Sequence, residues 1–363
     1  MQTYPIPMIP GPVSVPPEIL QAYQTDYGSG DLEREFLDLY NRTEADLQQI
    51  LATRSKVAIF TGEGMLALWA GLKSCLRTGD KVLAVGTGVF GFGIGDMARS
   101  IGAEVHTLGF AYDETIHDWE RVERAIVEFR PKMITAVHCE TPSGTLNPLD
   151  ELGRLKRKHG VPLLYVDAVA SLAGAPVRVD EWSIDLLLGG SQKALSVPPA
   201  MSFVAVSPAA WEVVRAVDYP GYDALLPFFS AQEDFYFPFT PYWHGMAALY
   251  AGTQRVLAEG LEAGFARHAR VAEFCRAGLV EAGYELFPAP GAIPAPTVTA
   301  VKVPAHMGWD LLDRRCRQAG LAVGGSYGPL AGKVFRLGHM GSQAEMALVE
   351  QAVEVLKRIL IRA

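Results

Sequence analysis

Apolar and amphipathic segments alternate along the first two thirds of the chain. Seven apolar runs of five or six residues are separated, for the most part, by segments in which apolar residues recur every three or four positions. Because continuous apolar strands alternate with helices, this pattern predicts a mainly parallel sheet covered by helices on both faces. The runs expected to form strands lie at 56–60, 81–85, 104–108, 132–137, 162–167, 185–190 and 202–206. The segments expected to form helices lie at 31–53, 64–75, 91–101, 118–129 and 150–159.

The pattern changes after Tyr242, where two long helical segments are followed by short strands that alternate with helices. These elements are expected at 242–263, 265–282, 298–302, 309–319, 334–337 and 342–360. At the other end, six of the 24 prolines fall within the first 17 residues, which indicates an extended arm. We therefore expect an N-terminal arm (1–20), a large α/β domain (21–250) and a smaller C-terminal α+β domain (251–363).

Composition and charge argue against several classes of protein. With 32 Lys and Arg against 40 Asp and Glu, the net charge is −8, and no cluster of cations offers a nucleic-acid surface. We expect no membrane span and no secretory leader, because long uncharged helical stretches and a basic-then-apolar start are both missing. Cys75, Cys139, Cys275 and Cys316 lie far apart in sequence, so we expect reduced thiols and a cytoplasmic protein.

Two charged residues stand alone in otherwise neutral stretches. Lys193 is the only charge in the 26 positions 186–211, and Asp167 is the only charge in 161–177. Most lysines are solvated, but one that follows a buried strand is desolvated, which lowers its pKa and yields a neutral amine for Schiff-base formation. A carboxylate at the end of a parallel strand lies where such sheets bind ligands. A pyridoxal cofactor needs both groups, the lysine for its aldehyde and the acid for its pyridine nitrogen.

Two other motifs suggest different chemistry. Residues 86–91 read G-x-G-x-x-G after a predicted strand, as in a dinucleotide site, but the acidic residue expected about 20 positions later is missing. His138 and Cys139 are adjacent at a strand end, so their side chains point to opposite faces. We therefore expect no metal, and an NAD-dependent oxidoreductase is the least favoured alternative.

Eight segments spread over nearly the whole chain follow the order of motifs in a known family. They are PGPVSVPPEIL, TGEGMLALWAGL, GTGVFGFG, ETPSGTLNPLDELG, VDAVASLAG, GGSQKALSVPPAM, PTVTAVKVP and GKVFRLGHMG. In these segments the sequence resembles the class V, fold-type I pyridoxal phosphate (PLP) aminotransferases, especially the alanine–glyoxylate and serine–pyruvate branch. The resemblance implies a homodimer with a seven-stranded, mainly parallel sheet in its large domain. It also implies amino transfer between a small amino acid of the alanine or serine type and pyruvate or glyoxylate.

The resemblance implies a role for each matching residue. Lys193 would form the Schiff base and, once freed, move the proton between substrate and cofactor. Asp167 would pair with the pyridine nitrogen, Phe90 would stack on the ring, and Thr141 would lie near the phenolic oxygen. Arg336 in VFRLGHMG would hold the substrate carboxylate, a bidentate task suited to guanidinium.

The same resemblance implies a phosphate cup at the start of a predicted helix. Gly64 and Met65 begin that helix, where backbone N–H groups and the helix dipole can hold a phosphate. Gln192, beside the lysine, matches a side-chain donor to the phosphate. Thr240 in FPFTP matches a residue that the partner subunit of the dimer contributes to the cup.

Two positions depart from the family pattern at this cup. Glu63 stands where the family usually has a small residue, often serine, and a carboxylate about 4 Å from a phosphate charge costs on the order of 4 kcal/mol at an effective dielectric of about 20. Phe237 stands where a partner tyrosine would donate to the phosphate, and a phenyl ring cannot donate. Either Glu63 points away, or the pocket holds a form of the cofactor without a phosphate.

These departures leave two alternatives to an amino acid transaminase. The cup is similar to that of pyridoxamine–pyruvate aminotransferase, which takes free pyridoxamine as its substrate in vitamin B6 degradation. Tyr327 takes the place of that enzyme's second arginine beside the substrate carboxylate, which puts Tyr327 in the substrate site. The other alternative is a PLP-dependent lyase or desulfurase, although none of the four cysteines lies in the Gly/Ser-rich loop that a desulfurase needs.

Overall fold

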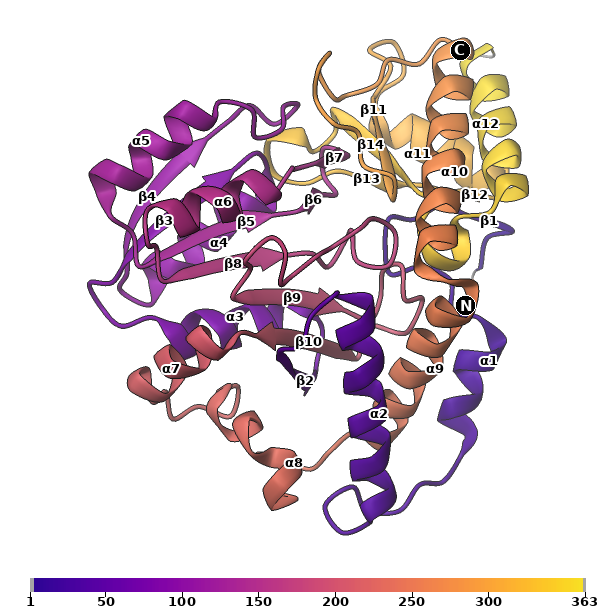
Figure 1. The fold of residues 1–363 in the computed structure, drawn as a ribbon. Helices are drawn as coiled ribbons and strands as arrows, with labels where there is room; N and C mark the ends of the chain where they lie inside the picture. Colours follow the sequence, from indigo (N-terminus) through magenta and orange to yellow (C-terminus); the bar gives the residue numbers. More distant parts are fainter. Residues whose placement is uncertain (1–2, 362–363) are drawn as a thin grey trace.

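A computed structural model describes residues 3–361 and contains a central seven-stranded sheet flanked by helices (Figure 1). The strands are ordered β2-β10-β9-β8-β5-β3-β4, and only β10 runs antiparallel to its neighbours. The mainly parallel sheet predicted from the apolar runs is therefore confirmed. Its strands are β2 (Lys56–Thr61), β3 (Lys81–Gly86), β4 (Glu104–Gly109), β5 (Met133–Val137), β8 (Leu163–Asp167), β9 (Leu186–Gly190) and β10 (Met201–Val206).

Apart from the edge strand β4, the sheet strands are apolar because helices cover them and leave almost none of their side chains exposed. The longest helix that was not expected from the sequence, α7 (Pro208–Val217), follows β10 directly. It is capped by the hydroxyl of Ser207, which accepts a hydrogen bond from Ala210 N. The other helices around this sheet are α2 (Arg34–Ile50), α3 (Gly64–Cys75), α4 (Val89–Ser100), α5 (Trp119–Phe129), α6 (Asp150–Lys158), α8 (Ala231–Asp234) and α9 (Trp243–Glu259). A short hairpin, β6 (Cys139–Glu140) and β7 (Thr145–Leu146), extends beyond β5.

A second hydrophobic core is built mostly from the last third of the chain. An antiparallel sheet of three strands, ordered β11-β14-β13, packs with three helices there. The elements are α10 (Leu261–Glu281), β11 (Val298–Lys302), α11 (Trp309–Gln318), β12 (Leu321–Ala322), β13 (Gly324–Gly325), β14 (Val334–Gly338) and α12 (Met346–Ile361). Within residues 3–361, no helix has the length and apolar character needed to span a lipid bilayer.

The start of the chain joins this second core rather than the first. Strand β1 (Ile6–Pro7) pairs in parallel with β12, and Figure 1 shows the two side by side. Met8 N donates to Ala322 O, and Gly338 N at the end of β14 donates to Met8 O. Beyond this point the chain crosses to the central sheet, where Val13 N donates to Gln192 O, and then forms the short helix α1 (Pro17–Leu20). The segment Ile9–Ser14 therefore bridges the two cores beside Lys193.

Candidate active site

The carboxyl ends of the parallel strands bring the predicted site residues to one edge of the central sheet. Asp167 is the last residue of β8, and Lys193 follows the end of β9 by three positions. Thr141 is buried just beyond β6, and Phe90 lies in the first turn of α4, after β3. Ligands bind at this edge in open α/β sheets, so the topology assembles the site that the isolated charges predicted.

The amine of Lys193 is held in a desolvated position. Its Nζ donates a hydrogen bond to the backbone carbonyl of Pro10 in the arm. Burial lowers the pKa of Lys193 to about 8, and the positive charge of Arg336 adds to this effect, while Asp167 opposes it. A lysine with this pKa supplies neutral amine near physiological pH, which is the form that attacks an aldehyde.

Asp167 has the opposite perturbation for the same physical reason. Burial raises the pKa of its carboxyl to about 6, with the nearby negative charge of Glu63 adding to the rise. The amide of Val169 donates to Asp167 Oδ1 at 2.9 Å, and Lys193 also favours the charged form. The carboxyl group is therefore fixed in orientation and is costly to leave unpaired, so a cationic ring nitrogen would be a favourable partner.

A buried carboxylate that sequence reasoning missed fixes the loop that carries Phe90. Glu140 is fully buried and accepts hydrogen bonds from Gly91 N at 2.6 Å and Phe90 N at 3.2 Å. A Cβ on Gly88 would lie 2.6 Å from the carboxyl carbon of Glu140, so this position requires glycine. Burial raises the pKa of Glu140 to about 7, although the hydrogen bonds from the amides of Gly91 and Phe90 act to lower it. The negative charge neutralises the positive end of α4 and sets the position of Phe90.

The predicted phosphate cup contains a carboxylate. Glu63 is the residue that caps α3: its Oε1 accepts from Met65 N at 2.9 Å, and its Oε2 accepts from Gln192 Nε2 at 3.3 Å. Gly64, the first residue of α3, packs against Val169, and a Cβ there would lie 3.1 Å from the Cγ2 of Val169. The carboxylate of Glu63 therefore lies at the N-terminus of α3, on the amide of Met65.

The guanidinium of Arg336 is buried, and among residues 3–361 no carboxylate forms an ion pair with it. Its Nε donates to Gly325 O at 2.9 Å, and its Cζ lies 4.6 Å from the centre of the Tyr327 ring. The side chain of Arg336 is 3% exposed, whereas that of Tyr327 is 52% exposed. Since a carbonyl and an aromatic ring leave the charge of Arg336 uncompensated, an anion such as a carboxylate would be a favourable ligand.

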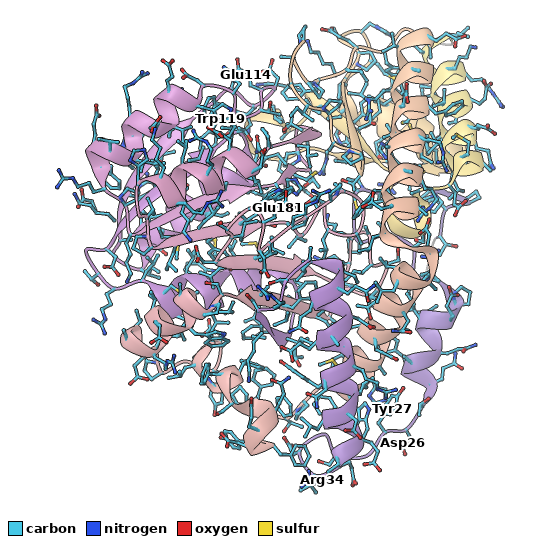
Figure 2. The ribbon with its side chains drawn as sticks, in the orientation of Figure 1. Asp26, Tyr27, Arg34, Glu114, Trp119 and Glu181 are labelled. Atoms are coloured by element: carbon cyan, nitrogen blue, oxygen red, sulfur yellow. The ribbon has the colours of Figure 1, made fainter. Side chains whose placement is uncertain are left out.

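The structure does not bring Thr240 into this chain's own site. Thr240 is exposed in the segment before α9, next to an aromatic cluster in which Tyr27 stacks on Trp243 at 5.4 Å. Figure 2 shows Tyr27 at the end of the molecule where α2 begins. Phe237 is buried within its own chain and packs on Phe36, with the ring centres 5.3 Å apart.

The residues present fit the ring of a pyridoxal group better than they fit its phosphate. Lys193 and Asp167 offer the amine and the carboxyl that the aldehyde and the ring nitrogen require. At the cup, Met65 N and Gln192 Nε2 already donate to Glu63. Within the described residues, Gln192 Oε1 is buried without a hydrogen-bond partner, so the cup has a free acceptor where a phosphate would need donors.

This fold and these charges define a pyridoxal-dependent enzyme of fold type I. A family model, aminotransferase class V, matches residues 10–234, and the chain belongs to this family of PLP-dependent transaminases. Similar proteins include the (S)-ureidoglycine–glyoxylate transaminase of Bacillus subtilis, 32% identical over 98% of this chain and 90% of that protein. The alanine–glyoxylate aminotransferase of Oryctolagus cuniculus is 32% identical over 97% and 91%. The structure of pyridoxamine–pyruvate aminotransferase from Mesorhizobium loti has a TM-score of 0.94, with 30% identity over 99% and 93%.

The structure also bears on the other chemistries considered. The helix N-terminus of the G-x-G-x-x-G segment is occupied by Glu140, so its amides are not available to a dinucleotide pyrophosphate. All four cysteines are buried, and burial raises the pKa of each thiol to about 12, which makes a desulfurase thiolate unfavourable. No group of three or more His, Cys, Asp or Glu side chains within residues 3–361 is arranged to hold a metal ion.

Proposed function

We propose that the enzyme transfers an amino group between a small amino acid and a small 2-oxo acid, with Lys193 as the residue that binds the cofactor aldehyde. The observation that carries this proposal is the desolvated amine of Lys193 set between a carboxyl group, Asp167, and a buried uncompensated cation, Arg336. These three charges match an aldehyde, a ring nitrogen and a substrate carboxylate. The alanine–glyoxylate and ureidoglycine–glyoxylate relatives support the same class of substrate.

Each residue has a defined task in this reaction. When bound, the pyridoxal ring stores the electron pair released as the substrate Cα loses its proton. Asp167 would keep the ring nitrogen protonated, and Phe90 would pack against the ring from the loop that Glu140 fixes. Arg336 would bind the substrate carboxylate and so orient the Cα–H bond toward Lys193. The amine of Lys193 would serve as the general base that takes up this proton and as the acid that gives it back.

Substitution of Lys193 tests this proposal. The Lys193→Ala variant should lose the absorbance of covalently bound pyridoxal, and amino transfer should fall by about 10²–10⁴-fold, the usual range for loss of a general acid–base. The measurement is alanine-to-glyoxylate transfer followed by product analysis. This also separates transamination, which conserves amino groups, from a lyase or desulfurase, which releases ammonia or sulfide. Unchanged absorbance or transfer in the variant would contradict the proposal.

A second candidate substrate is free pyridoxamine, with pyruvate as the amino acceptor. The observation that favours it is the carboxylate of Glu63 on the amide of Met65, in the position where a phosphate oxygen would be held. A 5′-hydroxymethyl group, unlike a phosphate, has a proton to donate, and Gln192 Oε1 and Glu63 are both acceptors. The relative from Mesorhizobium loti, named a pyridoxamine–pyruvate aminotransferase, has the same fold over nearly its whole length.

The direct test of this candidate omits PLP. Cofactor-free enzyme is mixed with pyridoxamine and pyruvate, and pyridoxal and alanine are measured against time. Equal amounts of the two products, formed at many turnovers per subunit, are expected for the free vitamer. If no pyridoxal and alanine appear in this mixture, free pyridoxamine is not the substrate, and the small amino acid stays the proposed amino donor.

We also propose a cytoplasmic homodimer in which Thr240 of one subunit completes the site of the other. Its support is the exposure of Thr240 together with the exposed aromatic ring of Tyr236 in the same segment. We also propose that each subunit consists of an N-terminal arm (1–20), a large domain (21–250) and a smaller C-terminal domain (251–363). Sedimentation should give twice the mass of the chain, and mixing a Lys193→Ala subunit with a Thr240 variant should restore activity only if sites are shared.

A further inference from the structure

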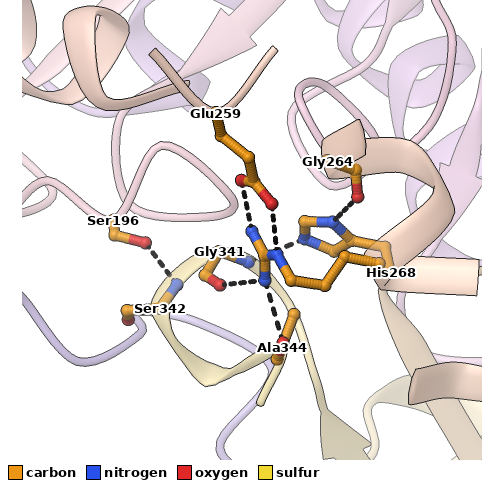
Figure 3. A network of polar contacts seen from close by, with 8 residues as sticks. Ser196, Glu259, Gly264, His268, Gly341, Ser342 and Ala344 are labelled. Atoms are coloured by element: carbon orange, nitrogen blue, oxygen red, sulfur yellow. Dashed lines mark hydrogen bonds and ion pairs between the residues drawn. The ribbon is translucent and has the colours of Figure 1, made fainter. Parts of the chain in front are cut away.

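A tight turn after β14 is anchored to both cores (Figure 3). The guanidinium of Arg267 on α10 donates to Gly341 O at 3.1 Å and to Ala344 O at 2.9 Å, and is itself paired with Glu259 at 2.7 Å. On the other side of the turn, His268 Nε2 accepts a hydrogen bond from Gly341 N at 2.9 Å. Burial lowers the pKa of His268 to about 4, so the ring is neutral and can accept at physiological pH.

The same turn is in direct contact with the loop that carries Lys193. Ser342 N donates to Ser196 Oγ at 2.8 Å, three residues after the lysine. A Cβ on Gly341 would lie 2.5 Å from Ala194 O, so this position requires the close approach that glycine allows. The turn is thus held at a fixed distance from the lysine loop.

The side chain of Gln343 extends from this turn to the N-terminal arm. It is 1% exposed, and its amide makes three hydrogen bonds. Its Oε1 accepts from Ser14 N at 3.0 Å, while its Nε2 donates to Ile9 O at 2.9 Å and to Gly338 O at 2.7 Å. One amide therefore closes both ends of the segment Ile9–Ser14 and ties it to the end of β14.

The segment closed in this way lies against the catalytic lysine. Pro10 O accepts from Lys193 Nζ, and a Cβ on Gly11 would lie 2.5 Å from Lys193 Cδ. Gly11 also has a φ of +95°, a conformation that favours glycine. On the opposite side, a Cβ on Gly338 would lie 2.5 Å from Ile9 O. The backbone of the arm is thus closely packed between Lys193 and β14, the strand that carries Arg336.

We propose that Gln343 is a positioning residue that holds the arm over Lys193, and that the arm backbone at Pro10 and Gly11 restricts amino donors to those with small side chains. This inference rests on the proposed amino transfer between small substrates. A donor whose amine reaches the lysine region and whose carboxylate reaches Arg336 must place its Cα beside this segment. We call the three hydrogen bonds of Gln343 the clamp. Without the clamp, the arm can move away from Lys193, which admits larger donors and exposes the lysine amine.

The test uses the full chain with Gln343→Ala and with Gln343→Met, which keeps the side-chain length but cannot form the three hydrogen bonds. Gln48→Ala is the matched control, because Gln48 also donates to a backbone carbonyl, Ser55 O at 3.0 Å, but on α2. The first measurement is the rate of reductive methylation of Lys193 by formaldehyde, with cyanoborohydride as the hydride donor, in cofactor-free protein, read by mass spectrometry. We expect a rise of about tenfold in both Gln343 variants, since a buried hydrogen bond corresponds to roughly that factor, and no change in Gln48→Ala.

The second measurement is donor selectivity in the enzyme loaded with cofactor. The ratio of kcat/KM for alanine to that for leucine should fall by about fivefold to tenfold in both Gln343 variants, again the scale of one hydrogen bond. In the wild-type protein, hydrogen exchange at Ser14 N should be slow, and exchange as fast as in a free peptide would overturn the clamp without any variant. Folded variants with wild-type labelling and selectivity would also overturn it. If the wild-type enzyme shows no amino transfer, the proposed function is refuted. The methylation rate of Lys193 then still tests whether Gln343 holds the arm over the lysine.

Discussion

The Glu63→Ser variant tests whether the carboxylate of Glu63 weakens the binding of a cofactor phosphate. Glu63 Oε1 lies 2.9 Å from Met65 N, so a phosphate oxygen bound to the same amide would be ~4 Å from the carboxylate. At an effective dielectric of about 20, this repulsion is about 4 kcal/mol, or roughly three powers of ten in affinity. Glu63 is partly exposed and can rotate away, so we expect between about 10-fold and 1000-fold tighter PLP binding in the variant. Serine preserves the fold because it also caps helices well.

The assay is equilibrium titration of the cofactor-free protein with PLP and, separately, with pyridoxal. The reasoning requires a gain for PLP alone, because pyridoxal carries no phosphate charge, and its affinity should stay constant or fall. Glu33→Ser, at the start of α2, is the matched control and should change neither constant. Equal PLP affinity in the wild type and the Glu63→Ser variant would refute the argument that Glu63 competes with a phosphate.

Three further outcomes follow from the site. Arg336→Lys should raise KM for the amino acid by about 10-fold to 100-fold with a smaller effect on kcat, since a bidentate charge-assisted contact is lost; steady-state kinetics will show whether kcat falls instead. Glu140→Gln should lower the melting temperature by a few degrees and change the circular dichroism of the bound cofactor, because one of two amide donors loses its acceptor. The pKa of Lys193, about 8, is below that of an ordinary lysine, so its neutral amine forms as the pH rises through this value. Attachment of pyridoxal to cofactor-free protein should therefore be half-maximal near pH 8. A midpoint near the pKa of a solvent-exposed lysine would contradict the burial of this amine.

The central sheet was predictable because burial on both faces makes each strand a continuous apolar run. The run at 202–206 led directly into α7, and no change in hydrophobicity marks the join, so that helix was missed. Strand β13 consists of Gly324 and Gly325, a residue type that is depleted in strands. A Cβ on Gly324 would lie 2.8 Å from Pro10 Cδ in the arm, and one on Gly325 would lie 3.0 Å from Trp309 Cζ2. Such pairings depend on contacts between distant parts of the chain and leave no local signal.

The candidate site was predictable where a charge stands alone, and the same rule would have found one residue that was missed. Glu140 is the only charge between Lys132 and Asp150, just as Lys193 and Asp167 are isolated in their own stretches. Sequence reasoning instead considered the neighbouring cysteine and Thr141. Gln343 offered no such signal, because a neutral glutamine in a polar turn is indistinguishable from a solvated one until the arm is seen against it.

The pairing of β1 with β12 has a consequence for the order in which the site is assembled. Ile6 is synthesised more than 300 residues before its partner in the pairing, Leu321. The large sheet can form in the meantime, since its strands lie between residues 56 and 206. The lysine pocket is therefore open during synthesis and closes last, when the slowest, most non-local contact forms. A nascent chain in this state would meet pyridoxal with its lysine still uncovered by the arm.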